Sequence, residues 1–151
     1  MIKIICVGKI KEKFFVDAIK EYEKRLSKYT KLQIIEVSDE SDPSINVCLK
    51  KESFSILKNI GDKDFVITLE IEGTKLNSVE FSKKIENLLI GNPNISFIIG
   101  GSNGLDKTIK QRSNFSLSFS EFTFPHQLFR ILLLEQIYRA FKILNNESYH
   151  K

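Results

Sequence analysis

The chain has 151 residues, a length that suits a single domain, residues 1–151, with a hydrophobic core of its own. Hydrophobic residues make up 42% and charged residues 28% of the chain, with only 3 prolines and 7 glycines, which excludes a disordered, collagen-like or low-complexity protein. The 23 lysines and arginines exceed the 19 acidic residues, and the net charge of +4 permits an anionic partner without requiring one.

Predicted strands and helices alternate along the whole chain. Strands are predicted where short segments are apolar or alternate, and helices where apolar residues recur every three to four positions. In chain order the segments are strand Ile2–Val7, helix 11–29, strand Leu32–Val37, helix 46–59, strand 65–71, helix 78–89, strand 95–99, helix 105–112, strand 115–120 and helix 125–145. This alternation predicts an α/β fold with a mostly parallel sheet and helices on both faces.

The last predicted helix carries apolar side chains on two faces. One apolar arc is centred near Arg130, and the opposite, polar face is interrupted by Leu128, Leu132 and Ile143. Two interpretations stay open: a helix buried deeply in its own domain, or a self-complementary homodimer interface. Arg130 itself predicts either an ion pair with a carboxylate of the sheet or of a partner, or a donor to a ligand phosphate or carboxylate.

Two features suggest binding sites, and each also has a simpler structural interpretation. The glycine-rich segment 100–104 follows a strand and precedes a helix, where free backbone N–H groups can meet a ligand. It matches neither GxGxxG nor a phosphate-binding P-loop, so a plain tight turn also explains it. A ridge of lysines on and before the first helix is either a solvated face or a contact for nucleic-acid phosphates. Its members are Lys9, Lys11, Lys13, Lys20, Lys24 and Lys28.

Cysteine and histidine usage argues against disulfide and metal chemistry. Cys6 and Cys48 form no CxxC pair, and His126 and His150 lack the spacing of metal ligands. His150 lies in a terminal tail that, judged by position alone, is expected to be frayed and inert. So few thiols fit a reducing compartment, and no segment approaches the roughly 20 apolar residues of a membrane span. The sequence therefore predicts a soluble cytoplasmic protein without a metal site or a membrane partner.

Four segments, taken together, resemble one family. They are 97–104 (FIIGGSNG), 117–127 (LSFSEFTFPHQ), 135–141 (EQIYRAF) and 149–151 (YHK). In this combination the whole chain is similar to the SPOUT-class ribosomal RNA large subunit methyltransferase H family. The resemblance implies a five- or six-stranded α/β domain with a C-terminal trefoil knot, and a homodimer with the last helix at its interface. It also implies that S-adenosylmethionine methylates N3 of a pseudouridine in the helix-69 loop of 23S ribosomal RNA, on assembled 70S ribosomes.

The resemblance also assigns site residues. Its cofactor motifs map onto stretches that follow the third, fourth and fifth strands, namely Leu69, Gly100 and Phe119, Ser120, Glu121, Phe122, Thr123 and Phe124. Leu69 and Phe119 are expected to supply apolar walls, and the loop backbones to hold an adenine edge. Tyr149, His150 and Arg139 are the candidates for binding the substrate or handling its N3 proton. A shorter segment after the second strand and Ser148 depart from the family pattern without touching the cofactor motifs.

Two other classes of function fit parts of the pattern. A non-catalytic module that binds RNA or the ribosome would need the lysine ridge but no cofactor loops. A different nucleotide-using α/β enzyme would need a phosphate-binding motif, which the sequence lacks. Calorimetric titration with S-adenosylmethionine distinguishes these possibilities.

Overall fold

Alternation of apolar side chains along the strands decides how the sheet is covered. In the first strand Ile2, Ile4 and Cys6 join one hydrophobic core, whereas Ile5 and Val7 join another. Successive side chains of a strand point to opposite faces of its sheet. Because both faces are apolar, helices must cover both of them.

The computed structural model describes residues 1–151 as five strands and five helices in strict alternation. Their bounds are β1 Ile2–Val7, α1 Lys13–Leu26, β2 Leu32–Val37, α2 Ile45–Leu57, β3 Asp64–Lys75, α3 Ser78–Gly91, β4 Asn94–Ile99, α4 Lys107–Arg112, β5 Phe115–Ser118 and α5 His126–Leu144. All strand pairs are parallel, and the strand order is β2-β1-β4-β3-β5. The predicted α/β fold is confirmed, and the trefoil knot stays a prediction.

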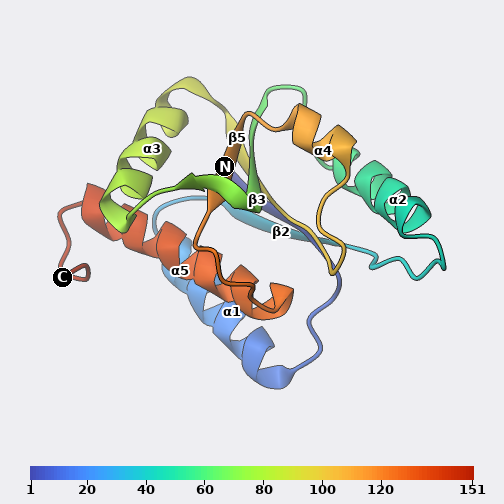
Figure 1. Ribbon diagram of the computed structural model, residues 1–151. Helices are drawn as coiled ribbons and strands as arrows, with labels where there is room; N and C mark the ends of the chain where they lie inside the picture. The colour runs from blue at the N-terminus through green and yellow to red at the C-terminus, as the bar shows by residue number, and fades with distance from the viewer.

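The helices form two layers around the sheet (Figure 1). Helices α1, α3 and α5 cover one face, where Leu26, Ile85 and Ile137 are fully buried in the larger core. Helix α5 lies between α1 and α3 and packs against both. Helices α2 and α4 cover the other face, where Ile56 and Ile109 are fully buried in the smaller core. None of these helices is both long enough and apolar enough to cross a membrane.

Two strands depart from the predicted bounds at the carboxyl edge of the sheet. Strand β3 runs to Lys75 because it bulges after Leu69, so that Leu69 and Thr74 both pair with Leu117 of β5. Strand β5 was expected to reach residue 120 but ends at Ser118, where its pairing with β3 stops. Both departures leave backbone without strand pairing at the same edge of the sheet. The unpaired stretches are residues 70–73 in the bulge and residues 119–125 between β5 and α5.

Arg130 connects α5 to the sheet. Its side chain is only 2% exposed, and it donates to the Glu36 carboxylate at 2.6 Å and to the Gly8 carbonyl at 3.0 Å. Glu36, in β2, also accepts from the backbone N–H of Ile10 at 3.0 Å. The ion-pair interpretation of Arg130 is therefore confirmed. The pair fixes the start of α5 to the carboxyl ends of β1 and β2.

Candidate active site

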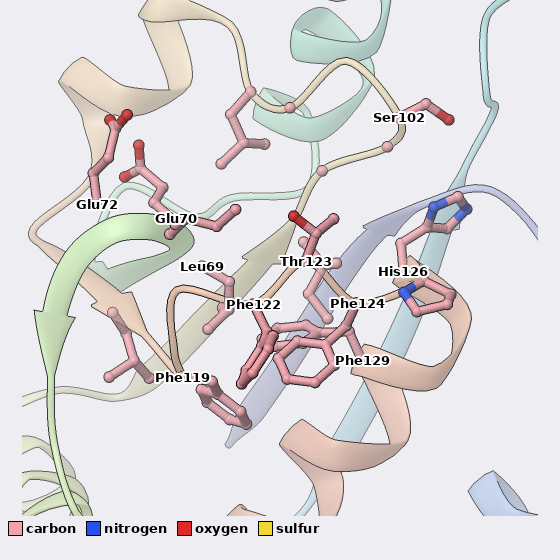
Figure 2. Close-up of a pocket in the computed structure, with 18 of the residues that line it drawn as sticks. Leu69, Glu70, Glu72, Ser102, Phe119, Phe122, Thr123, Phe124, His126 and Phe129 are labelled. Carbon is pink, nitrogen blue, oxygen red and sulfur yellow. The ribbon is translucent and has the colours of Figure 1, made fainter.

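A pocket opens at the carboxyl ends of β3, β4 and β5 (Figure 2). It is formed by the bulge of β3, the glycine-rich segment after β4, the segment before α5 and the first turn of α5. Parallel sheets bind ligands at this edge because the loops of neighbouring strands converge there. The cavity measures about 440 Å³, which lies within the range of small-molecule and cofactor sites.

Most of the residues predicted to bind the cofactor meet in this pocket. Seven of the eight line it: Leu69, Gly100, Phe119, Ser120, Phe122, Thr123 and Phe124. The eighth, Glu121, lies outside the lining, and its exposed carboxylate pairs with Lys75 at 3.0 Å. Stretches far apart in the sequence converge because β3 lies between β4 and β5 in the sheet.

Aromatic rings form one wall of the pocket. Phe119 and Phe124 both pack against Phe129 of α5, with ring centroids 4.8 and 5.8 Å apart. Phe122 also lines the pocket, but 77% of its surface is exposed. Sequence reasoning placed Phe129 only in the apolar arc of the last helix and missed its place in the site. An apolar wall of this kind suits a planar heterocycle such as adenine.

Segment 100–104 is both a tight turn and a wall of the pocket. Gly101 and Gly104 form a bridge, and Gly104 has a φ of +78°. A Cβ added at Gly100 would lie 2.6 Å from the carbonyl oxygen and 2.9 Å from the carbonyl carbon of Gly104. Only glycine fits at position 100 without moving this backbone. The turn and ligand interpretations of the segment are therefore compatible.

Two carboxylates that sequence reasoning left out, Glu70 and Glu72, also line the pocket. Glu70 accepts hydrogen bonds from the hydroxyls of Ser116 at 2.6 Å and Thr68 at 2.7 Å, and pairs with Lys110 at 3.3 Å. Burial works to raise the pKa of Glu70, but these donors outweigh it and hold that pKa below its usual value. The pocket therefore presents a fixed negative charge. The sequence feature that could have pointed to Glu70 and Glu72 is their position at the end of an otherwise apolar strand.

The three catalytic candidates gather at a second place, around Glu135 of α5. Arg139 donates to the Glu135 carboxylate at 2.6 Å, and the Tyr149 hydroxyl donates to it at 3.1 Å. The Arg139 guanidinium lies 4.7 Å from the centroid of the Tyr149 ring, and its Nη1 is 3.3 Å from Nδ1 of His150. Tyr149 packs against α5, so the expectation of a frayed tail is wrong for that residue, while His150 and Lys151 are exposed. Sequence reasoning missed the role of Glu135, although this residue begins the family-like segment 135–141.

Within one chain, the tail cluster lies apart from the pocket. His126 lines the pocket at the first turn of α5, and Arg139 lies about 20 Å further along the helix axis. A groove between α3 and α5 leads from one to the other. It shares Leu117 and Phe119 with the pocket and reaches Glu135.

Comparison with known proteins identifies the family. A family model described as "Predicted SPOUT methyltransferase" matches residues 1–150. The chain belongs to the SPOUT methyltransferase family. A curated protein of Clostridium botulinum (strain Hall), named Ribosomal RNA large subunit methyltransferase H, is 57% identical over 99% of each chain. A Methanococcus vannielii protein named Putative ribosomal RNA large subunit methyltransferase H is 55% identical over the same shares.

A solved structure shares the fold of this chain. It is described as a probable methylase family protein from Haemophilus influenzae Rd KW20, and the TM-score is 0.57 at 15% identity. The similarity covers 99% of this chain and 70% of that chain. The resemblance drawn from the sequence motifs is thus confirmed at the level of family and fold.

SPOUT methyltransferases in general use S-adenosylmethionine, and the pocket suits that molecule. The rings of Phe119, Phe124 and Phe129 offer a wall for its adenine. The held carboxylate of Glu70 offers a partner for its positively charged groups. No three His, Cys, Asp or Glu side chains gather in this structure as a candidate metal site.

Gly100→Ala is expected to weaken S-adenosylmethionine binding by about tenfold or more. The added Cβ has to displace the Gly104 carbonyl, which deforms the turn that walls the pocket. Isothermal titration calorimetry measures the affinity. Gly91→Ala is the matched control, because a Cβ at Gly91 meets nothing within 4 Å. Wild-type affinity in a folded Gly100→Ala protein would remove this turn from the site.

Proposed function

We propose that the chain transfers a methyl group from S-adenosylmethionine to N3 of a pseudouridine in the helix-69 loop of 23S ribosomal RNA, on assembled 70S ribosomes in the cytoplasm. The observation that carries this proposal is the convergence of three distant motif stretches on one pocket. The name shared by relatives 57% identical over nearly their full length supports a large-subunit RNA substrate.

The proposed chemistry needs orientation more than covalent catalysis. S-adenosylmethionine supplies a methyl group that is already activated as part of a sulfonium, so the protein needs no nucleophile. The residues that would hold it are those of the pocket, with the aromatic wall against the adenine. The Glu70 carboxylate, kept in place by Thr68 and Ser116, would attract its cationic part. Leu69 and the turn after Gly100 complete the lining.

The substrate side of the reaction requires removal of the N3 proton of the uracil ring. A nearby base or hydrogen-bond acceptor would assist this step. We assign substrate binding and proton handling to Tyr149, His150 and Arg139. Glu135 holds Arg139 and Tyr149 in one arrangement and is assigned a positioning role. Burial and the neighbouring Glu135 carboxylate raise the pKa of Tyr149, so that its phenol stays protonated and donates a hydrogen bond at neutral pH.

The proposal includes a homodimer through α5, in which one protomer's tail reaches its partner's pocket. Within one chain the tail cluster does not line the pocket, and Arg139 lies about 15 Å along α5 from Phe129, the last pocket residue on that helix. A two-fold axis beside α5 would bring the tail of one copy toward the pocket of the other. Leu128, Leu132 and Ile143 are only half-buried in the single chain, which leaves apolar surface for such a contact.

Leu132→Glu is expected to convert the dimer into a monomer. Leu132 lines the groove between α3 and α5 together with Glu135. The variant would place a carboxylate without a cationic partner next to Glu135 and bury it in the dimer interface. Sedimentation velocity at micromolar concentration measures the change. Ile90→Glu on α3 is the control, because Ile90 is 81% exposed and can carry a charge in water. Wild-type protein that sediments as a monomer would contradict the homodimer.

Methyl transfer to ribosomes tests the proposed function. Labelled S-adenosylmethionine is incubated with 70S ribosomes that lack the modification, and the label is expected in 23S RNA. Mass spectrometry of the helix-69 fragment then locates the methyl group on N3 of pseudouridine. Label in another RNA, or at another position, would overturn the proposed substrate. A non-catalytic ribosome-binding module would bind ribosomes without showing any heat of S-adenosylmethionine binding.

A further inference from the structure

Helices α2 and α4 carry more cations than carboxylates, and two further carboxylates, Asp42 and Asp106, lie just before their first turns. Residues 45–58 and 107–112 contain six lysines and arginines and one acidic residue, Glu52. Glu52 is only 3% exposed and accepts a backbone hydrogen bond from Glu40. Helix α1 differs, because Asp17, Glu21 and Glu23 are interspersed with its four cations. The two helices thus form a basic face, which α1 does not.

Exposed apolar side chains lie among these cations. Phe54 is 62% exposed, and the Lys58 ammonium lies 4.1 Å from the centroid of its ring. Lys50, Phe54 and Lys58 are spaced by four residues, which places them on one side of the helix. An exposed ring flanked by cations is the arrangement with which proteins stack an unpaired base and neutralise its phosphates.

The two helices form a rigid platform. Ile56 of α2 and Ile109 of α4 are buried in the same core, and the Thr108 hydroxyl donates to Ser53 at 3.2 Å. Asp106 caps α4 by accepting from the backbone N–H of Thr108 at 3.0 Å. The cations therefore have a fixed spacing, which favours binding to a regular phosphate backbone.

Few of these cations are neutralised within the chain. Lys50, Lys58 and Lys107 form no ion pair, and Lys51 reaches Asp42 only at 4.0 Å. Lys110 pairs with Glu70 at 3.3 Å inside the rim of the pocket. Arg112 is half-buried and donates to the backbone carbonyls of Gly61 and Asp64 at 3.1 Å. The cations available to a partner are therefore the exposed lysines Lys50, Lys51, Lys58 and Lys107.

The basic face is continuous with the pocket. Lys110 belongs to α4 and lines the pocket, so the surface passes from the site onto α4 and then α2. Both helices lie on the side of the sheet opposite α5 (Figure 1). A dimer through α5 leaves this side open. An RNA strand with one base at the pocket can continue across it.

We propose that the outer face of α2 and α4 binds the phosphate backbone of the ribosomal RNA substrate, with Phe54 stacked on an unpaired base. This inference rests on the proposed function, because it takes its partner from there. The excess of exposed lysines over carboxylates on these two helices favours RNA over a ribosomal protein as the partner, since a phosphate backbone presents only negative charge.

Charge removal at matched positions tests the proposal. Lys50→Gln/Lys51→Gln on α2 is compared with Lys20→Gln/Lys24→Gln on α1, and all four lysines are exposed. Both variants remove two positive charges, so net charge is controlled. The α2 variant is expected to raise the KM for ribosomes roughly tenfold, with kcat and S-adenosylmethionine affinity unchanged. The α1 variant is expected to behave as wild type, and equal KM values for the two variants would overturn the proposal.

Direct binding to ribosomes at several salt concentrations separates RNA from protein contacts. Loss of phosphate contacts is expected to make the plot of log Kd against log salt shallower by roughly 0.7 per contact. Phe54→Ser is expected to weaken binding without changing that slope, because base stacking carries no counterions. An unchanged slope in the α2 lysine variant would indicate docking on a ribosomal protein and overturn the RNA assignment. Wild-type protein that binds ribosomes but transfers no methyl group would refute the proposed function, while the binding comparison would still test this face.

Discussion

Deletion of Tyr149, His150 and Lys151 is expected to lower methyl transfer to ribosomes by at least about 100-fold, the usual contribution of acid–base and positioning groups. The tail supplies an aromatic ring that can stack on a base, an imidazole that can accept or donate a proton, and a cation for phosphate. A flipped base that must lose a ring proton needs these groups. The rate with labelled S-adenosylmethionine and unmodified 70S ribosomes measures the loss.

Binding and stability measurements separate a catalytic tail from a structural one. Tyr149 packs edge-on against Tyr138 with ring centroids 5.0 Å apart and donates to Glu135 at 3.1 Å. Losing these contacts is expected to cost about 1–2 kcal/mol of folding free energy, which thermal unfolding records. Cofactor affinity is expected to change by less than about threefold, because residues 69–129 form the pocket walls and the partner's tail is assigned to the substrate.

Point variants divide the tail's effect among its residues. Tyr149→Phe keeps the ring but loses the hydrogen bond to Glu135, so it tests positioning. His150→Ala leaves that bond in place and removes only the imidazole. If the truncated protein transfers methyl groups at the wild-type rate, the catalytic assignment is wrong. If S-adenosylmethionine affinity collapses instead, the tail belongs to the cofactor pocket.

Local sequence patterns were enough to predict the order and type of the secondary structure. Strands Ile2–Val7 and Leu32–Val37 have the predicted bounds because each is mostly apolar and is followed by glycine or a polar residue. The capping box at Asn77 and Glu80 is present, with both hydrogen bonds at 2.8 Å. The bulge in β3 could not be predicted, because it depends on the register with β5, a strand that follows much later in the chain.

The site was predictable only where motifs carried it. Seven of the eight residues that the resemblance predicts to bind the cofactor line one pocket, whereas the eighth, Glu121, pairs with Lys75 outside it. Glu70 and Glu135 were missed because their significance lies in partners from other elements, the hydroxyl of Ser116 and the tail residue Tyr149. Such pairings follow from tertiary packing, which a helical wheel or a strand pattern does not describe.

Glu36→Ala is expected to destabilise the fold by about 3–5 kcal/mol, and more than Arg130→Met does. Without Glu36, the Arg130 guanidinium stays buried with only the Gly8 carbonyl as acceptor, and its Nε already lacks a partner. Without Arg130, the Glu36 carboxylate is left, but its side chain is 33% exposed and water can solvate it. Urea unfolding of the two variants measures the difference.

The double variant Glu36→Ala/Arg130→Met tests whether the unpaired, buried charge of Arg130 causes the loss of stability in Glu36→Ala. If it does, removing Arg130 as well is expected to restore part of the stability that Glu36→Ala loses, since no unpaired cation remains in the core. A double variant less stable than Glu36→Ala would show instead that the packing of α5 against the ends of β1 and β2 dominates. Equal losses of stability in the two single variants would also contradict this explanation. The Arg130 side chain is 2% exposed and the Glu36 side chain 33%, so an unpaired Arg130 is expected to cost more.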